Sequence, residues 1–215
     1  MKWWNSKIRV FLLTVVLCLS FVTQANAQSE YERRMYNYQT RWSKLIPKYT
    51  KVQFAGGMGF LSLGGGWNYG KNKQWETDVL FGFIPRYSDE KVRATFTLKQ
   101  NFIPWNVKLG KDFSMDPLSC SLYANSVLDG DYWASAPDKY PNGYYSFSTK
   151  IRFNMALGQR FTYHFPVDKR RTRKSVTFFY EIGTNELYLI SAFCNSYLKP
   201  NDYLHLSLGL KVQIL

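Results

Sequence analysis

A histidine and a serine stand two positions apart near the C-terminus, at a spacing that could support nucleophilic chemistry. His205 and Ser207 flank Leu206, and residues two apart in an extended strand lie on the same face. An imidazole beside a hydroxyl can activate it as a nucleophile, which makes this pair a catalytic candidate. Polar residues alternate through the whole stretch in any case, so the pair alone assigns no catalytic residue and a non-enzymatic protein is favoured.

Charged residues recur on the polar faces of several alternating segments. If the apolar faces point outward from a closed sheet, these charges point inward, where an unpaired charge costs several kcal/mol. We therefore expect a lumen ionic network, with Glu76 and Asp78 paired to Arg93 and Lys99; a narrow conduit through the lumen is the alternative. The expected network consists of Glu76, Asp78, Arg93, Lys99, Lys150, Arg152, Arg160 and Glu181.

Five cations fall within residues 169–174, namely Lys169, Arg170, Arg171, Arg173 and Lys174. In an extracellular loop they could contact the phosphates of lipopolysaccharide, whereas a solvated turn needs no ligand. The formal net charge of +13 would also suit nucleic acid, but no nucleic-acid-binding module is recognisable. The expected partners are therefore outer-membrane lipid and, through this loop, lipopolysaccharide.

Strict alternation of apolar and polar residues indicates the elements that position these groups. Residues 203–214 alternate without a break, and about a dozen residues suit a tilted strand that crosses a bilayer. Further strands are expected over 74–84, 92–102, 118–124, 151–165, 176–182 and 186–196, and in the glycine-rich stretch 52–69. The apolar phase of that stretch switches near Phe60, which indicates a bulge or a tight turn.

These eight segments predict an all-β fold, a closed antiparallel transmembrane β-barrel. Closure is required because lipid cannot satisfy the hydrogen bonds of an open edge. Ten strands result if 52–69 and 151–165 each split in two. A soluble barrel of the lipocalin type, with its apolar residues facing a ligand cavity, stays open as an alternative.

The N-terminus has the pattern of a Sec-type export signal. Cations at Lys2, Lys7 and Arg9 precede an apolar run over 10–22 and the small-residue motif Ala25-Asn26-Ala27, so residues 1–27 are expected to be removed. Residues 28–48 are expected to form a short amphipathic helical segment, and residues 49–215 the barrel. Together with the expected barrel, such a signal predicts the outer membrane of a Gram-negative bacterium, where the barrel-assembly machinery would insert the protein.

No pattern for a metal or a cofactor occurs. The chain lacks CxxC, HExxH and a phosphate-loop glycine pattern, so no cofactor is expected. Beyond the export signal the cysteines are Cys120 and Cys194, which could pair in an oxidising compartment or stay free.

Two stretches carry a family resemblance: 70–85, with Gly70-Lys71-Asn72-Lys73-Gln74-Trp75-Glu76-Thr77-Asp78 and Phe81-Gly82-Phe83-Ile84-Pro85, and Tyr197-Leu198-Lys199-Pro200-Asn201-Asp202-Tyr203. Through them the chain resembles uncharacterised small outer-membrane β-barrel proteins of the Bacteroidetes type. It is also similar to outer-membrane lipid A deacylases, whose penultimate strand carries His-x-Ser-Asn. Ala192 and Cys194 stand at the histidine and serine positions here. The resemblance therefore implies an outer-membrane barrel with a structural or surface-interaction role, and a lipid-acting enzyme as the alternative.

Overall fold

The computed structural model describes residues 30–86, 91–129, 150–166, 174–194 and 199–214. The chain forms two compact units, Met1–Ile46 and Pro47–Leu215. In the first, a helix over 30–43 lies within the segment 28–48 that was expected to be helical. The expected export signal lies outside the described residues. None of the helices in the described ranges has the length and apolar character to span a membrane.

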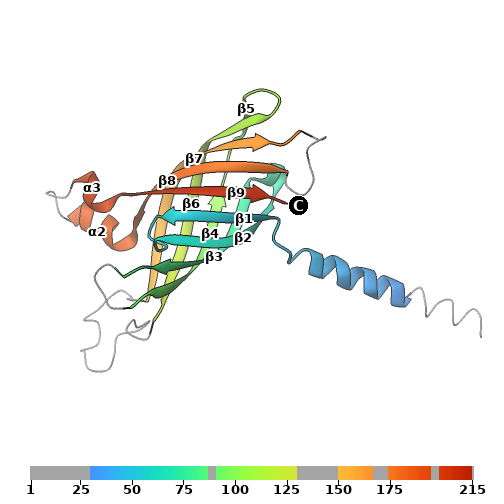
Figure 1. The fold of residues 1–215 in the computed structure, drawn as a ribbon, viewed down its shortest axis with the longest axis horizontal. Coiled ribbons are helices and arrows are strands. Elements are labelled where there is room, and N and C mark those ends of the chain that lie inside the picture. The colour runs from blue at the N-terminus through green and yellow to red at the C-terminus, as the bar shows by residue number, and fades with distance from the viewer. Residues whose placement is uncertain (1–29, 87–90, 130–149, 167–173, 195–198, 215) are drawn as a thin grey trace, which may run out of the picture. The chain divides into compact units, whose positions relative to one another are not determined.

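The second unit is a closed antiparallel barrel of eight strands, as the alternation predicts (Figure 1). Each strand pairs with its neighbours in sequence, and the β1–β9 and β4–β6 pairings close the sheet. The eight strands are β1 (Tyr49–Ala55), β2 (Leu61–Tyr69), β3 (Trp75–Ile84), β4 (Arg93–Phe102), β6 (Phe113–Leu128), β7 (Ile151–His164), β8 (Ser175–Asn185) and β9 (His205–Gln213). The short elements are η1 (Lys71–Lys73), β5 (Val107–Lys108) on the edge of β6, α2 (Glu186–Cys194) and α3 (Pro200–Tyr203).

Two of the eight expected strands are wrong, and the two errors cancel in the count. The stretch 52–69 contains two strands, because the chain reverses at Gly56 and Gly57, where φ is +85° and +74°, values that glycine adopts without strain. The expected strand over 186–196 is instead the helix α2, whose first turn is capped by a bond from the Tyr188 amide to Asn185 Oδ1 (2.9 Å). Strand β7 runs through Gly158 without splitting, so ten strands do not form.

The side chains of the barrel are arranged opposite to those of a water-soluble core. Large apolar side chains on the outside are well exposed, for example Leu63 (60%), Phe81 (59%) and Phe153 (64%). Charged side chains on the inside, such as Lys99 and Glu181, are fully buried. The barrel therefore has an apolar exterior and a polar, charged interior.

The two ends of the barrel differ in the connections that they carry. We call the end at which the chain enters β1 and leaves β9 the terminal end; it also carries the connections 70–74, 103–112 and 165–174. The opposite, distal end carries the connections 56–60, 85–92, 129–150 and 186–204. An even number of strands places the start of β1 and the end of β9 at one end of the barrel, whereas the end of β6 and the start of β7 lie at the other.

Candidate functional site

Buried ion pairs fill the middle of the barrel. Lys51 Nζ lies 2.7 Å from Asp78 Oδ2, and Lys99 forms a salt bridge with Glu181 across the lumen. Polar neighbours complete these pairs: Asn101 Nδ2 donates to Asp78 (2.8 Å). Since both charges of each pair are fully buried and hydrogen-bonded, the middle of the lumen is a packed ionic layer.

A second cluster lies nearer the terminal end, around Glu76. Its carboxylate accepts from Arg160 Nη1 at 2.6 Å and also forms a salt bridge with Lys211. Arg160 lies directly opposite Asp116 in the β6–β7 register. Two cations and two carboxylates therefore meet here from β3, β6, β7 and β9.

The predicted network is brought together in part. Glu76, Asp78, Lys99, Arg160 and Glu181 lie in these two clusters, whereas the remaining three residues lie at the distal end. There Arg93 Nε contacts Asp129 (2.8 Å), Arg152 contacts Glu186 (3.4 Å), and Lys150 adjoins the start of β7.

The predicted pairing of Glu76 and Asp78 with Arg93 and Lys99 is wrong. In the β3–β4 register Arg93 stands opposite Ile84, eight residues from Glu76 and so roughly 26 Å along the strand. Lys99 does stand opposite Asp78, but its salt bridge is with Glu181. Sequence reasoning also missed Lys51, although it has the inward phase of β1 next to the outward Val52.

The distal end of the lumen is closed by the β1–β2 turn, which folds inward. The carbonyl oxygen of Gly56 accepts from the hydroxyl of Tyr123, and that of Gly57 accepts from Asn125 Nδ2 (2.6 Å). Met58 at the tip of the turn is fully buried and packs with Leu80, Tyr123 and Ala156. The turn therefore caps the ionic layer from the distal side.

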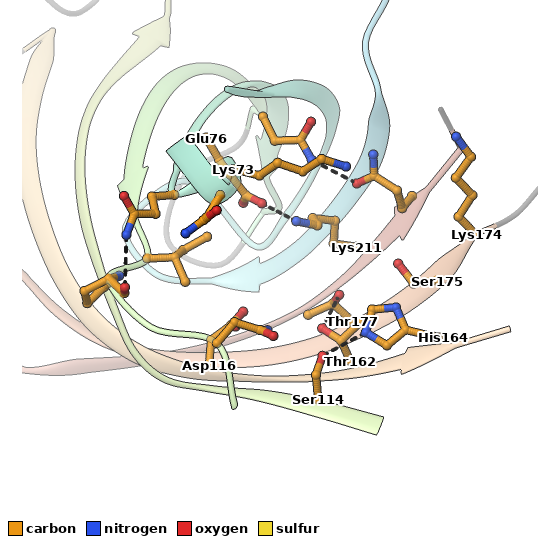
Figure 2. A pocket seen from close by; sticks show the side chains of 17 residues that line it. Lys73, Glu76, Ser114, Asp116, Thr162, His164, Lys174, Ser175, Thr177 and Lys211 are labelled. Atoms are coloured by element: carbon orange, nitrogen blue, oxygen red, sulfur yellow. Dashed lines mark hydrogen bonds and ion pairs between the residues drawn. The ribbon is translucent and has the colours of Figure 1, made fainter. Parts of the chain in front are cut away.

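The terminal end, in contrast, opens into a polar vestibule of about 630 Å³ (Figure 2). Glu76 and Lys211 line its inner part and join it to the ionic cluster. Fifteen of its seventeen lining residues are polar or charged, and the two others are Ile103 and Pro104. The polar lining consists of Asn68, Asn72, Lys73, Gln74, Glu76, Asn106, Ser114, Asp116, Thr162, His164, Lys174, Ser175, Thr177, Lys211 and Gln213.

Hydrogen bonds fix one wall of the vestibule. Ser114 Oγ lies 2.9 Å from His164 Nε2, and the hydroxyls of Thr162 and Thr177 lie 2.8 Å apart; Figure 2 shows this wall facing Glu76 and Lys211. A serine on a histidine nitrogen has nucleophile–base geometry. In the described part of the chain no carboxylate bonds to His164, because the nearby Asp116 is held by Asn106 (2.6 Å). The pair therefore lacks the orienting third group of a triad.

The candidate pair His205 and Ser207 is not joined by a hydrogen bond in the structure. His205 Nε2 lies 3.3 Å from the Tyr123 hydroxyl, whereas Ser207 is buried and accepts from Gln53 Nε2 (3.0 Å). Their shared inward face follows from the strand, as expected, but each side chain contributes to packing inside the barrel.

The remaining sequence-derived candidates have the following positions. Of the cationic run, Lys169, Arg170, Arg171 and Arg173 lie outside the described residues, whereas Lys174 is exposed and lines the vestibule. The stretch compared with the catalytic strand of lipid A deacylases forms the helix α2 as far as Cys194, so it is not a penultimate strand. Cys120 and Cys194 are both free thiols. Within the described ranges no group of three or more His, Cys, Asp or Glu residues could hold a metal ion.

Comparisons with protein-family models, with curated proteins and with solved structures find no match for this chain. The fold and the chemistry of its two ends therefore carry the functional argument.

Proposed function

We propose that this protein is a non-enzymatic outer-membrane barrel of a Gram-negative bacterium, exported by a Sec-type signal, with a structural or surface-interaction role. The observation that carries the proposal is the apolar exterior around a charged, filled interior. In water, exposed apolar surface is unfavourable by roughly 25 cal/mol per Å². Hydrocarbon tails outside the barrel would remove this cost.

Aromatic side chains at both ends of the barrel support the proposal that a lipid bilayer surrounds it. At the distal end Phe60 packs between Phe54 and Phe83, at centroid distances of 4.9 and 6.0 Å. At the terminal end Trp75 packs on Phe102 at 4.6 Å. Eight residues of β3 separate Trp75 from Phe83, about 26 Å along the strand and roughly 20 Å in height at a tilt near 40°. Two aromatic girdles flanking an apolar band of this height are typical of outer-membrane barrels.

The interior supports a role other than conduction. The inward turn at Met58 closes the distal side, and the ion pairs of Asp78 and Glu181 fill the middle. An eight-stranded barrel has room for its own side chains and little else. We therefore expect no ion-conducting pore, in contrast to the conduit alternative.

The two alternative functions find less support. A lipocalin-type protein needs apolar side chains around an inner cavity, whereas the vestibule wall is polar and the described lumen is filled mostly by polar and charged side chains. A lipid-acting enzyme needs an activated nucleophile, and Ser114 on His164 is the pair that has the geometry. Incubation with lipopolysaccharide and phospholipid tests it; acyl release that is abolished by Ser114→Ala would establish the enzyme and refute our proposal.

Site-directed spin labels test the position of the barrel in lipid. Single cysteines replace Leu206, Phe96 and Phe153 in a Cys120→Ser, Cys194→Ser background, and Lys71→Cys in an exposed turn is the control. We expect a lipid-soluble relaxation agent to reach the three outward positions and a water-soluble agent to reach position 71. Shielding of the three outward positions from the lipid-soluble agent, or extraction of the protein by salt without detergent, would refute a membrane barrel.

A further inference from the structure

We propose that the vestibule binds a small anionic molecule that carries several hydroxyl groups, with the chemistry of a glycerol phosphate, either free or as a lipid headgroup. This inference goes beyond the proposed function and does not rest on it, because it concerns the lining of the vestibule and not the surroundings of the barrel.

The vestibule has the size and shape of a ligand site. Its volume of about 630 Å³ is within the range of small-molecule pockets. It ends at Glu76 and Lys211, beyond which the ionic layer fills the lumen. A molecule that enters from the terminal end therefore meets a closed floor, so the space is a pocket and not a passage.

The charges around the pocket favour an anion. At the floor, Lys211 and Arg160 are balanced by Glu76 and Asp116. At the mouth, Lys73 and Lys174 line the pocket with exposed ammonium groups, and neither has a salt-bridge partner among the described residues. A phosphate between or beside these lysines would gain charge-assisted hydrogen bonds.

The uncharged lining favours hydroxyl groups on the same ligand. Ser114, Thr162 and Thr177 present hydroxyls on one wall, and five side-chain amides lie around the pocket, from Asn68, Asn72, Gln74, Asn106 and Gln213. The lining has no Phe, Tyr or Trp side chain, so it offers little apolar surface to a ligand. Hydroxyls, which both donate and accept, match such a surface.

A buried polar atom in the wall has no partner yet. Asn68 is 5% exposed, and its Oδ1 lacks a hydrogen bond, whereas its Nδ2 approaches Gln213 Oε1 at 3.5 Å. An unsatisfied buried amide is unfavourable unless water or a ligand completes it. A ligand hydroxyl at this point of the wall would donate to Asn68.

Calorimetric titration of the full chain in a non-ionic detergent tests the inference. The probes are glycerol 3-phosphate, glycerol and inorganic phosphate. We expect glycerol 3-phosphate to bind at least tenfold more tightly than either fragment, because it alone reaches both the lysines and the hydroxyl-bearing wall. Saturable binding that is no tighter than that of inorganic phosphate would overturn the inference.

Matched lysine variants show where the ligand binds. The double variant Lys73→Gln, Lys174→Gln should weaken binding about tenfold or more, since each lost charged hydrogen bond contributes on the order of tenfold. Lys71→Gln changes a neighbouring exposed lysine that does not line the pocket and should leave binding unchanged. An equal loss in Lys71→Gln would show a diffuse surface effect and refute a built site. Resistance to detergent before boiling verifies that each variant is folded.

Experiments in lipid nanodiscs distinguish a soluble glycerol phosphate from a lipid headgroup as the ligand. If phosphatidylglycerol in the disc competes with glycerol 3-phosphate and phosphatidylcholine does not, the ligand is a lipid headgroup. If neither lipid competes, the ligand is a soluble molecule. Absence of saturable binding by glycerol 3-phosphate in detergent and by both lipids would refute the inference, while the spin-label test of the membrane position would stand unaffected.

Discussion

The lumen of this barrel is filled at its distal end and hollow at its terminal end. At the distal end, Gly56 and Gly57 let the backbone turn inward, so carbonyl groups and Met58 occupy the space. At the terminal end, side chains of modest length line the wall and leave about 630 Å³ unfilled. The hollow is therefore local, because the same strands are fully packed one or two residue pairs further in.

The two ends also differ in how their charges are paired. At the distal end Arg93 and Arg152 contact Asp129 and Glu186. At the terminal end Lys73 and Lys174 have no such partner in the described chain. A filled end with paired charges favours stability, whereas a hollow end with unpaired cations favours binding. Four measurements test this contrast.

The largest effect is expected from the ionic layer that separates the two ends. Asp78→Asn removes the partner of Lys51 and leaves a buried charge unpaired, which should lower the free energy of unfolding by about 3–5 kcal/mol. Urea-induced unfolding in lipid vesicles measures it. The double variant Asp78→Asn, Lys51→Met should regain part of the loss. A single variant within about 1 kcal/mol of the original protein would show that the layer is hydrated and that the lumen is not closed.

The next effect concerns packing at the distal cap. Met58→Ala empties a fully buried position and should cost about 2–4 kcal/mol of unfolding free energy. Leu109→Ala, at an exposed position of the terminal end, should change it by less than about 0.5 kcal/mol. Equal effects of the two substitutions in the same unfolding assay would mean that the inward turn does not hold the distal end closed.

Much of the barrel could be predicted from the sequence, because a strand with one apolar and one polar face has a simple period of two residues. In β9, Leu206, Leu208 and Leu210 alternate with residues that face inward, and the structure has the same phase. The helix α2 was missed because its apolar residues also fit an alternating pattern. Asn185 followed by Glu186 was the available signal, a capping residue with an acid in the first turn.

The arrangement of the interior could be predicted less well, because it depends on register. The inward phase of Glu76, Lys99 and Glu181 follows from alternation, but the salt bridge between β4 and β8 spans the lumen and has no local signal. The vestibule has even less of a local signal, since its lining comes from six strands and several connections. The register of the β6–β7 pair brings Ser114 next to His164, fifty residues away in the sequence.

Thiol accessibility compares the two ends directly. Thr177→Cys on the vestibule wall and Thr97→Cys in the distal half are matched substitutions at buried positions, in the Cys120→Ser, Cys194→Ser background. A water-soluble maleimide should label position 177 about a hundredfold faster than position 97. This ratio corresponds to a difference of about 2.7 kcal/mol in the free energy of exposing the thiol to the reagent. Comparable labelling rates would show that water reaches both halves of the lumen, and would contradict a closed distal end.

The smallest effect is expected from the paired charges at the rim of the distal end. Glu186→Gln removes the partner of Arg152, but both side chains are partly exposed, and such pairs contribute about 0–1 kcal/mol. The Glu186 carboxylate also accepts from the backbone amide of Phe153 at 2.9 Å, a bond that the glutamine carbonyl can retain. We therefore expect the unfolding free energy to fall by less than about 1 kcal/mol, and less still at high salt. A loss as large as that of Asp78→Asn would mean that the distal rim, and not the buried layer, holds the barrel together.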